Sequence, residues 1–247
     1  MNSVIQWPLP PAQWSAEQSG IDVWAFPLDA DLATLSLCRR LLSNVELECA
    51  GQFASPIDQK RFIVGHGRLR QILGHYVQSS PAALEFRLGH RDKPALAPGV
   101  GNVEFNLAHS RDLGVLAVSR AGPVGIDIES IEPVDDMAGI VRRFFSRRER
   151  AQFEALSEDR KIEAFFNLWT RKEACLKATG EGIGESLDKV EVAFLPGEPA
   201  RLLTANGEPD PAPPWTLFDL AAAPGYAAAL ASLPGAPAPV CWRWPDS

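Results

Sequence analysis

The order of predicted elements begins twice along this chain, on either side of the turn AGP at 121–123. The first run contains two predicted helices among short predicted strands. Its segments are, in order, a strand at 23–28, a helix at 31–51 that ends at a glycine, an amphipathic helix at 57–77, and strands at 83–88, 103–108 and 113–119. A chain that repeats such an order is expected to fold as two similar units.

The second run starts with a strand and continues into three helical segments. These segments are a strand at 124–131, helices at 135–145, 146–156 and 158–180, and short strands from residue 187. We therefore expect an α+β fold of two pseudo-symmetric half-domains, 1–122 and 123–247, although no residue-level repeat is visible. A ligand cleft is expected between the two half-domains.

Composition limits the class of protein. Of the 247 residues, 46% are hydrophobic and 22% are charged, which is typical of a soluble globular protein. The formal net charge of −7 argues against general nucleic-acid binding. Residues 1–122 carry 11 basic and 11 acidic side chains, whereas residues 123–247 carry 13 and 20, so the second half is the better place for a cation.

Targeting signals and cysteine patterns point to the cytoplasm. The amino terminus lacks a basic region followed by an apolar run, and no apolar stretch reaches the ~18 residues that span a bilayer. The four cysteines show no CxxC spacing, which favours a reduced compartment and argues against a cysteine metal site. We expect no membrane association.

Two acids interrupt the apolar strand VGIDIES at 124–130. Successive side chains of a strand point to opposite faces, so Ile126 and Ile128 face one way while Asp127 and Glu129 face the other. Alternating acids usually mark the solvent face of a strand, and that interpretation stays open for this pair.

The helix FFNLWTRKEACLKATG at 165–180 gives a third acid a defined direction. Trp169, Glu173 and Lys177 are four residues apart and share one helical face. If this helix packs beside the strand at 124–130, three carboxylates converge, and Mg²⁺ prefers such oxygen ligands. The alternative is an ordinary surface pair between Glu173 and Lys177.

Five motifs in order identify a resemblance. They are RFIVGHGRLRQIL at 61–73, DKPAL at 92–96, FNLAHS at 105–110, VGIDIE at 124–129 and the helix at 165–180. Together they resemble the 4′-phosphopantetheinyl transferases, specifically the double-length surfactin-type group. The resemblance covers about residues 50–195, and its most specific parts are GIDIE and W-x-x-K-E-x-x-x-K.

The resemblance implies a metal site and a catalytic group. Asp127, Glu129 and Glu173 would hold Mg²⁺, and Lys177 would assist at the diphosphate and the leaving group. Glu173, directly or through a metal-bound water, would accept the proton of the attacking hydroxyl.

The resemblance also implies contacts to coenzyme A. His109 would contact the pyrophosphate, Lys93 the phosphate or adenosine end, and Arg61 the phosphates on the nucleotide. The chain departs from the family at Ala108, where many relatives place a serine that touches phosphate. It also departs near Glu46 and Cys49, where some relatives carry lysines that reach the 3′-phosphate.

The implied reaction moves the phosphopantetheine arm of coenzyme A to a serine of an acyl or peptidyl carrier protein, with release of 3′,5′-ADP. A monomer is expected, because both halves lie in one chain. The basic segment 141–151 is a candidate docking surface for an acidic carrier protein. Two alternatives are a non-catalytic protein that binds coenzyme A or a carrier, and a Mg²⁺-dependent hydrolase of nucleotide diphosphates.

Overall fold

The structure is a computed structural model that describes residues 3–16, 20–88, 93–180, 187–205, 208–209 and 214–245. Its first half runs from a strand through three helices to four more strands. In chain order these are β1 (Ile21–Pro27), α1 (Leu32–Leu41), α2 (Asn44–Gly51), α3 (Pro56–Val77), β2 (Phe86–Leu88), β3 (Pro94–Leu96), β4 (Glu104–Ser110) and β5 (Leu113–Ser119).

The second half repeats this order of elements. In chain order these are β6 (Val124–Ser130), α4 (Met137–Phe144), α5 (Arg147–Glu154), α6 (Glu158–Thr179), β7 (Glu191–Ala193), β8 (Arg201–Ala205), β9 (Glu208–Pro209), β10 (Thr216–Asp219) and β11 (Tyr226–Ser232). A last strand, β12 (Val240–Arg243), follows. Single 3₁₀ turns precede β2 and β7.

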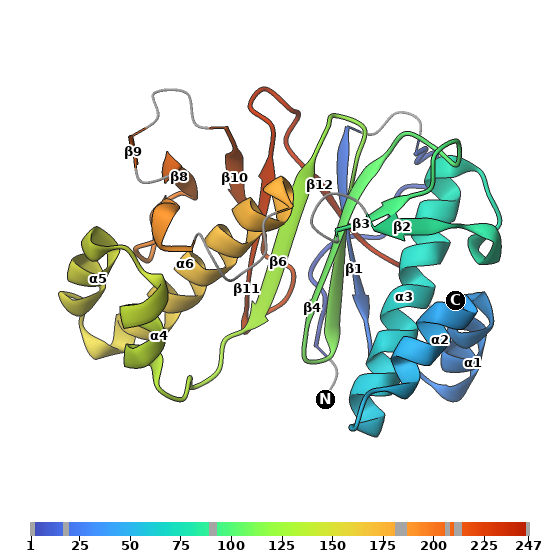
Figure 1. The fold of residues 1–247 in the computed structure, drawn as a ribbon, viewed down its shortest axis with the longest axis horizontal. Coiled ribbons are helices and arrows are strands. Elements are labelled where there is room, and N and C mark those ends of the chain that lie inside the picture. The colour runs from blue at the N-terminus through green and yellow to red at the C-terminus, as the bar shows by residue number, and fades with distance from the viewer. Residues whose placement is uncertain are drawn as a thin grey trace.

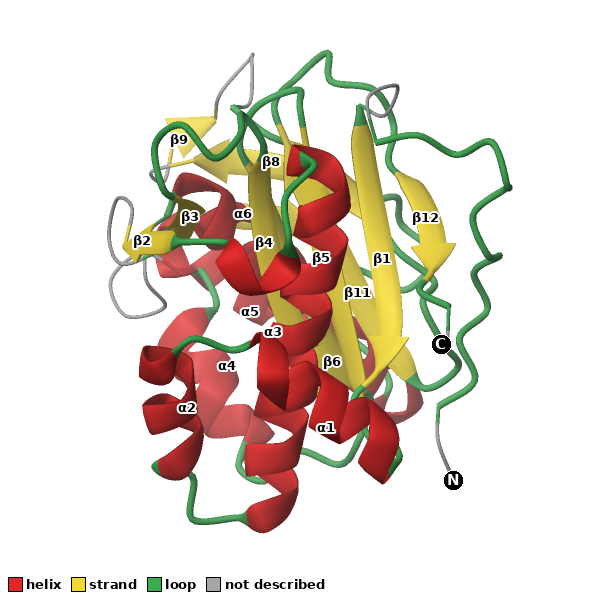
Figure 2. Ribbon diagram, turned by 90° about the vertical axis from the view of Figure 1, so that its right-hand side faces the viewer, coloured by secondary structure: helices red, strands yellow, loops and turns green. Residues whose placement is uncertain are grey.

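The elements form four layers, helix, sheet, sheet and helix (Figure 1). One sheet has the order β12-β1-β5-β4 and carries α3 on its outer face, and the other has the order β10-β11-β6 and carries α6. The apolar faces of β1, β5, β6 and β11 pack against one another between the sheets. Figure 2 shows the strands behind the helices of the first half.

Strand registers show that the two halves are related. β1 pairs antiparallel with β5, which pairs with β4, and β6 pairs antiparallel with β11, which pairs with β10. Ile21 lies opposite Ser119 at the end of β5, and Val124 lies opposite Ser232 at the end of β11. Each half also has a long helix of 22 residues. The predicted α+β class is confirmed.

The predicted helix at 31–51 is wrong in one respect, because the chain forms two helices there. Leu42 is extended, with ψ of 144°, and ends α1. Ser43 then begins α2 with a capping box, in which its side chain accepts from the Glu46 amide and the Glu46 carboxylate accepts from the Ser43 amide. The apolar spacing runs through this break, so periodicity alone does not reveal it.

The predicted helix at 158–180 is confirmed as α6. Gly180 closes it in the left-handed conformation, with φ of 76°, and its amide bonds to the Leu176 carbonyl. The helix at 57–77 is likewise confirmed as α3, which Ser55 caps. These two long helices carry three of the seven predicted site residues, Arg61 on α3 and Glu173 and Lys177 on α6.

Both ends of the chain cross the predicted boundary at residue 122. Near the amino terminus, the Gln6 amide bonds to the Ala222 carbonyl of the second half. Near the carboxyl end, β12 pairs in parallel with β1. The boundary itself lies between β5 and β6 and stays a prediction, but neither half is made only from its own sequence range.

None of the helices in the described ranges has the length and apolar character needed to cross a membrane. The four cysteines are free thiols, with Cys38 and Cys175 buried.

Candidate active site

A glycine brings β6 and α6 into close contact. A Cβ atom on Gly125 would lie 2.1 Å from the Ala174 carbonyl oxygen and 2.3 Å from the Ala178 amide nitrogen. A side chain at position 125 would therefore collide with the α6 backbone, and only glycine fits there. Because strand side chains alternate, Asp127 and Glu129 lie on the same face as Gly125 and are directed to the α6 side.

Asp127 is buried, so the solvent-face interpretation is wrong for it. Its side chain is 6% exposed, and its Oδ1 accepts from Lys177 Nζ at 2.5 Å. Its Oδ2 is buried and has no hydrogen-bond partner. Burial raises the pKa of Asp127 to about 7 against the opposing effect of Lys177, and the charges of Glu129 and Glu173 raise it further.

Glu173 and Glu129 complete the acidic cluster. Glu173 is 2% exposed, and its Oε1 is buried without a hydrogen-bond partner. Burial raises the pKa of Glu173, and the charge of Glu129 adds to this shift. Glu129 is half-buried, its Oε2 accepts from Ser110 Oγ at 2.9 Å, and burial raises its pKa. The three predicted acids thus influence one another electrostatically.

The positions of these acids do not by themselves match a metal site. Among the described residues, no group of three or more His, Cys, Asp or Glu side chains is placed to hold an ion. Lys177 instead supplies the positive charge beside Asp127. The set of metal ligands therefore stays a prediction.

His109 lies at the end of β4 near the cationic residues of the predicted site. Its side chain is exposed at the surface, yet neighbouring protein lowers the pKa of the ring, first by partial desolvation and then through the charge of Lys177. The charges of His66 and Arg61 act in the same direction. Ala108, by contrast, is buried in the core between the sheets.

The structure places Lys93 and Arg61 against protein partners. Lys93 Nζ donates to the Val124 carbonyl at 2.8 Å, and burial lowers its pKa. Arg61 makes a two-point ion pair with Asp29, at 2.7 Å from Nε to Oδ1 and 2.9 Å from Nη2 to Oδ2. Both cations are therefore held in fixed positions before any ligand binds.

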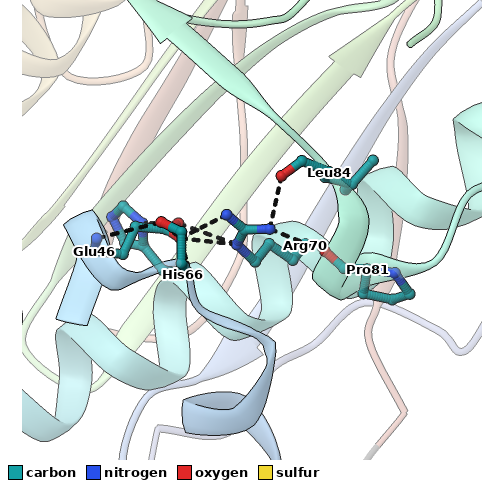
Figure 3. A network of polar contacts seen from close by, with 6 residues as sticks. Glu46, His66, Arg70, Pro81 and Leu84 are labelled. Carbon is teal, nitrogen blue, oxygen red and sulfur yellow. Dashed lines mark hydrogen bonds and ion pairs between the residues drawn. The ribbon is translucent and has the colours of Figure 1, made fainter.

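Glu46 belongs to an ion-pair network (Figure 3). Its Oε2 accepts from Arg70 Nη2 at 2.6 Å, and its Oε1 lies 3.1 Å from His66 Nδ1. Arg70 also donates to the carbonyls of Pro81 and Leu84. Burial alone would raise the pKa of Glu46, but the bonds from His66, Arg70 and Ser43 hold it well below its usual range.

The structure has two cavities among the described residues. One of about 390 Å³ is lined by residues that include Tyr76, Asn102 and Arg120. One of about 210 Å³ is lined by residues that include Asp29 and Lys60, next to Arg61 in sequence. Neither is lined by a predicted site residue, so the predicted cleft between the halves stays a prediction.

Sequence reasoning missed Asn106 and Ser110, the two polar residues that flank Ala108 on one face of β4. Asn106 Oδ1 accepts from the Ile126 amide at 2.7 Å, and Ser110 Oγ accepts from the Ser130 amide at 3.1 Å. The alternation of Asn106, Ala108 and Ser110 was a usable signal, because it places all three on the face opposite His109.

Comparison with known proteins identifies the family. The 4′-phosphopantetheinyl transferase HetI of Nostoc sp. is 38% identical over 213 residues, which cover 85% of this chain and 86% of HetI. The chain belongs to the 4′-phosphopantetheinyl transferase family. The profile of the 4′-phosphopantetheinyl transferase superfamily matches residues 123–231 of this transferase, most of its second half.

Other relatives of this phosphopantetheinyl transferase are more distant. The 4′-phosphopantetheinyl transferase Sfp of Bacillus subtilis is 28% identical over 151 residues, 61% of this chain and 66% of Sfp. The crystal structure of Thermotoga maritima holo-[acyl-carrier-protein] synthase is 24% identical and covers 45% of this chain and 62% of that one, with a TM-score of 0.33, too low for a comparison of folds.

Proposed function

We propose that this transferase moves the 4′-phosphopantetheine arm of coenzyme A to a serine of an acyl or peptidyl carrier protein and releases 3′,5′-ADP. The observation that carries the proposal is the buried acidic cluster of Asp127, Glu129 and Glu173 with Lys177 and His109 beside it, in a chain of this family. We further propose that it is a surfactin-type member that acts in the cytoplasm as a monomer.

The acidic cluster has the chemistry of a Mg²⁺ site. Asp127 Oδ2 and Glu173 Oε1 are buried carboxylate oxygens without partners, which is costly unless a cation compensates them. Hard oxygen donors on two facing elements fit Mg²⁺, which takes the rest of its shell from water and phosphates. Asp127, Glu129 and Glu173 would hold the ion, and when bound it supplies neutralisation of charge on the diphosphate.

Each side chain has a role in the proposed reaction. The serine oxygen forms a bond to the phosphorus that carries pantetheine, and the bond from this phosphorus to the oxygen of 3′,5′-ADP breaks. Glu173 accepts the serine proton, directly or through a water. Lys177 and His109 stabilise the negative charge that grows on the diphosphate.

Arg61 and Lys93 are proposed to bind the nucleotide end of coenzyme A. Each is already oriented by a protein partner, Asp29 for Arg61 and the Val124 carbonyl for Lys93. A donor that is held in place loses less conformational entropy when a phosphate binds. Ala108 has no hydroxyl to make the phosphate contact proposed for the serine of many relatives, and its side chain lies in the core between the sheets.

One incubation tests the proposed function. Apo carrier protein, coenzyme A and Mg²⁺ are mixed with the enzyme, and the carrier is weighed by mass spectrometry while the nucleotide products are separated. A gain equal to phosphopantetheine, with 3′,5′-ADP formed in equal amount, is expected. Nucleotide release without a gain in carrier mass identifies a hydrolase, and the absence of both identifies a binding protein.

A further inference from the structure

Among the residues that the structure describes, one edge of β6 has no strand partner. β6 pairs with β11 along one edge and is the last strand of its sheet, and β4 is the last strand of the other sheet. β4 and β6 nevertheless lie side by side (Figure 1). In an antiparallel pair, alternate residues direct both backbone groups to the partner, and the residues between them direct theirs to the opposite edge.

Side chains of the first half bind this free edge. Asn106 Oδ1 accepts from the Ile126 amide at 2.7 Å, and Ser110 Oγ accepts from the Ser130 amide at 3.1 Å. Lys93 Nζ donates to the Val124 carbonyl at 2.8 Å. The three bound β6 residues, Val124, Ile126 and Ser130, are separated by even numbers of residues, as expected for groups on one edge.

The contacts from β4 have a constant register. Asn106 binds a residue 20 positions later, and so does Ser110. Side chains four residues apart on β4 thus meet amides four residues apart on β6, with the two strands running in the same direction. We name this arrangement, made by Asn106 and Ser110 with Ile126 and Ser130, the β4–β6 junction.

The β4–β6 junction brackets the acidic pair. Ile126 directly precedes Asp127, and Ser130 directly follows Glu129. Ser110 Oγ also donates to Glu129 Oε2 at 2.9 Å, so one hydroxyl fixes both the backbone and the carboxylate. His109 lies on the opposite face of β4, between the two junction residues in sequence.

We propose that Asn106 and Ser110 are positioning residues that hold β6 in register with β4 and thereby set the place of the acids relative to His109. The coenzyme A measurement below rests on the proposed function, whereas the exchange measurement does not. The physical reason is that a buried amide without an acceptor is costly, so the strands keep the register that satisfies both amides.

Site-resolved amide hydrogen exchange on the free protein tests the proposal without substrate. In Asn106→Leu, which keeps the size but removes the acceptor, the Ile126 amide should exchange at least about tenfold faster, the equivalent of about 1.4 kcal/mol. The amides of Asp127 and Glu129, which point to β11, should keep their protection. Asn167→Leu is the matched control, since Asn167 is also half-buried but contacts Phe194 instead. Unchanged exchange at Ile126 overturns the proposal.

A conservative variant separates positioning from general damage. Asn106→Asp keeps an acceptor oxygen, so its Ile126 amide should exchange as in the wild type, and exchange as fast as in Asn106→Leu overturns the proposal. If Asn106→Leu does not fold, Ser110→Ala provides the same test at the Ser130 amide. That amide should exchange faster by a similar factor, and unchanged protection there contradicts the inference.

Ligand binding tests the link to the site. By titration calorimetry at a temperature where all variants are folded, Asn106→Leu and Ser110→Ala should bind coenzyme A at least about fivefold more weakly than wild type, whereas Asn167→Leu should bind normally. Faster exchange with unchanged affinity contradicts the positioning role. A wild-type protein that does not bind coenzyme A refutes the proposed function, and the exchange result then still decides the junction.

Discussion

The two halves share one topology but differ in what lies between the first strand and the long helix. By register, Trp24 of β1 and Asp127 of β6 occupy equivalent positions, as do Asp22 and Gly125. In the first half this space contains aromatic rings, with Trp14 and Trp244 packed on Trp24. In the second half it contains the acidic cluster.

Hydrogen bonding differs in the same way. Tyr76 of α3 donates to Oδ2 of buried Asp22 at 2.5 Å and accepts from Trp24 Nε1 at 2.9 Å. Trp242 Nε1 donates to Asp22 Oδ1 at 3.0 Å, so both carboxylate oxygens of Asp22 have a hydrogen-bond partner. Asp127 has one oxygen bound by Lys177 and one without a partner. An unsatisfied buried carboxylate costs stability and is typical of functional sites.

The second edges of β1 and β6, the first strands of the two halves, also differ. β12 covers the second edge of β1 with backbone pairs, whereas side chains of the first half bind the second edge of β6 in the described part of the chain. One copy of the repeated unit is thus closed and packed, and the other stays open to polar chemistry. The comparison indicates that the space between β1 and α3 serves as packed support, whereas the equivalent space between β6 and α6 is the one that we propose for the metal.

Removing an acid from the second half should have the largest effect. Asp127→Asn, Glu129→Gln and Glu173→Gln should each lower the transfer rate by about a hundredfold or more and leave the protein folded, because each removes charge from the proposed metal site. Trp24→Phe, at the position equivalent to Asp127, should lower stability instead. Near-normal turnover with saturating Mg²⁺ in any two of the acid variants would defeat the metal proposal.

Closing the gap between β6 and α6 should follow in size. Gly125→Ala places a methyl group against backbone atoms on α6, which we expect to lower the free energy of unfolding by about 2 to 3 kcal/mol. Denaturant unfolding measures this change. Gly51→Ala is the control, because an added Cβ there meets nothing within 4 Å, and it should be neutral or slightly stabilising. Equal effects of the two substitutions would contradict the close packing.

Breaking the aromatic network of the first half should affect stability and not chemistry. Tyr76→Phe removes the hydroxyl between Trp24 and Asp22 and leaves a buried carboxylate short of one donor. The expected loss is about 1.5 to 3 kcal/mol in the free energy of unfolding, with the transfer rate changed less than about twofold when measured well below the unfolding temperature. A large loss of rate in the folded protein would show that the aromatic network of Tyr76, Trp24 and Asp22 takes part in catalysis.

The Glu46 network predicts a pH-dependent contribution to stability. Folding lowers the pKa of the Glu46 carboxyl. The contribution of Glu46 to the free energy of unfolding is therefore complete above the unfolded pKa of about 4.3 and declines as the pH falls below it. Glu46→Gln should cost about 1 to 2 kcal/mol at pH 7 and clearly less at pH 3, measured by urea unfolding at both values. A difference that stays constant with pH would show that Arg70 is not bound to an ionised Glu46.

Charge reversal on α5 should have the smallest effect. Arg147 and Arg148 are exposed at the start of α5, and an acidic carrier protein would meet them during docking. Changing both to Glu should raise the KM for the carrier about threefold to tenfold and leave the KM for coenzyme A unchanged. Arg39 and Arg40, exposed on α1, provide the matched reversal. Equal changes in both KM values would contradict docking at α5.

Much of this comparison was predictable from the sequence. The alternation in VGIDIES placed Asp127 and Glu129 on one face, and the spacing of Glu173 and Lys177 placed them on one face of α6. Gly180 ended that helix as predicted. These features depend on local geometry, which has periods of 2 and 3.6 residues in strands and helices.

Features that depend on long-range contacts were not predictable in this way. The break at Ser43 interrupts a continuous apolar pattern, and the pairing of β12 with β1 joins opposite ends of the chain. The partner of Arg61 is Asp29, 32 residues away, and no local pattern specifies it. Lys93 precedes a proline, as many turn residues do, and only the fold brings it to the edge of β6.

We propose that the acids of β6 and α6 bind one divalent ion, unlike the equivalent positions of the first half. Titration calorimetry of Mg²⁺ into the wild-type protein with coenzyme A present tests this most directly. One bound ion per chain is expected for the wild type and for Tyr76→Phe, and no detectable binding for Asp127→Asn or Glu173→Gln. Equal Mg²⁺ affinity in wild type and both acid variants would contradict the claim.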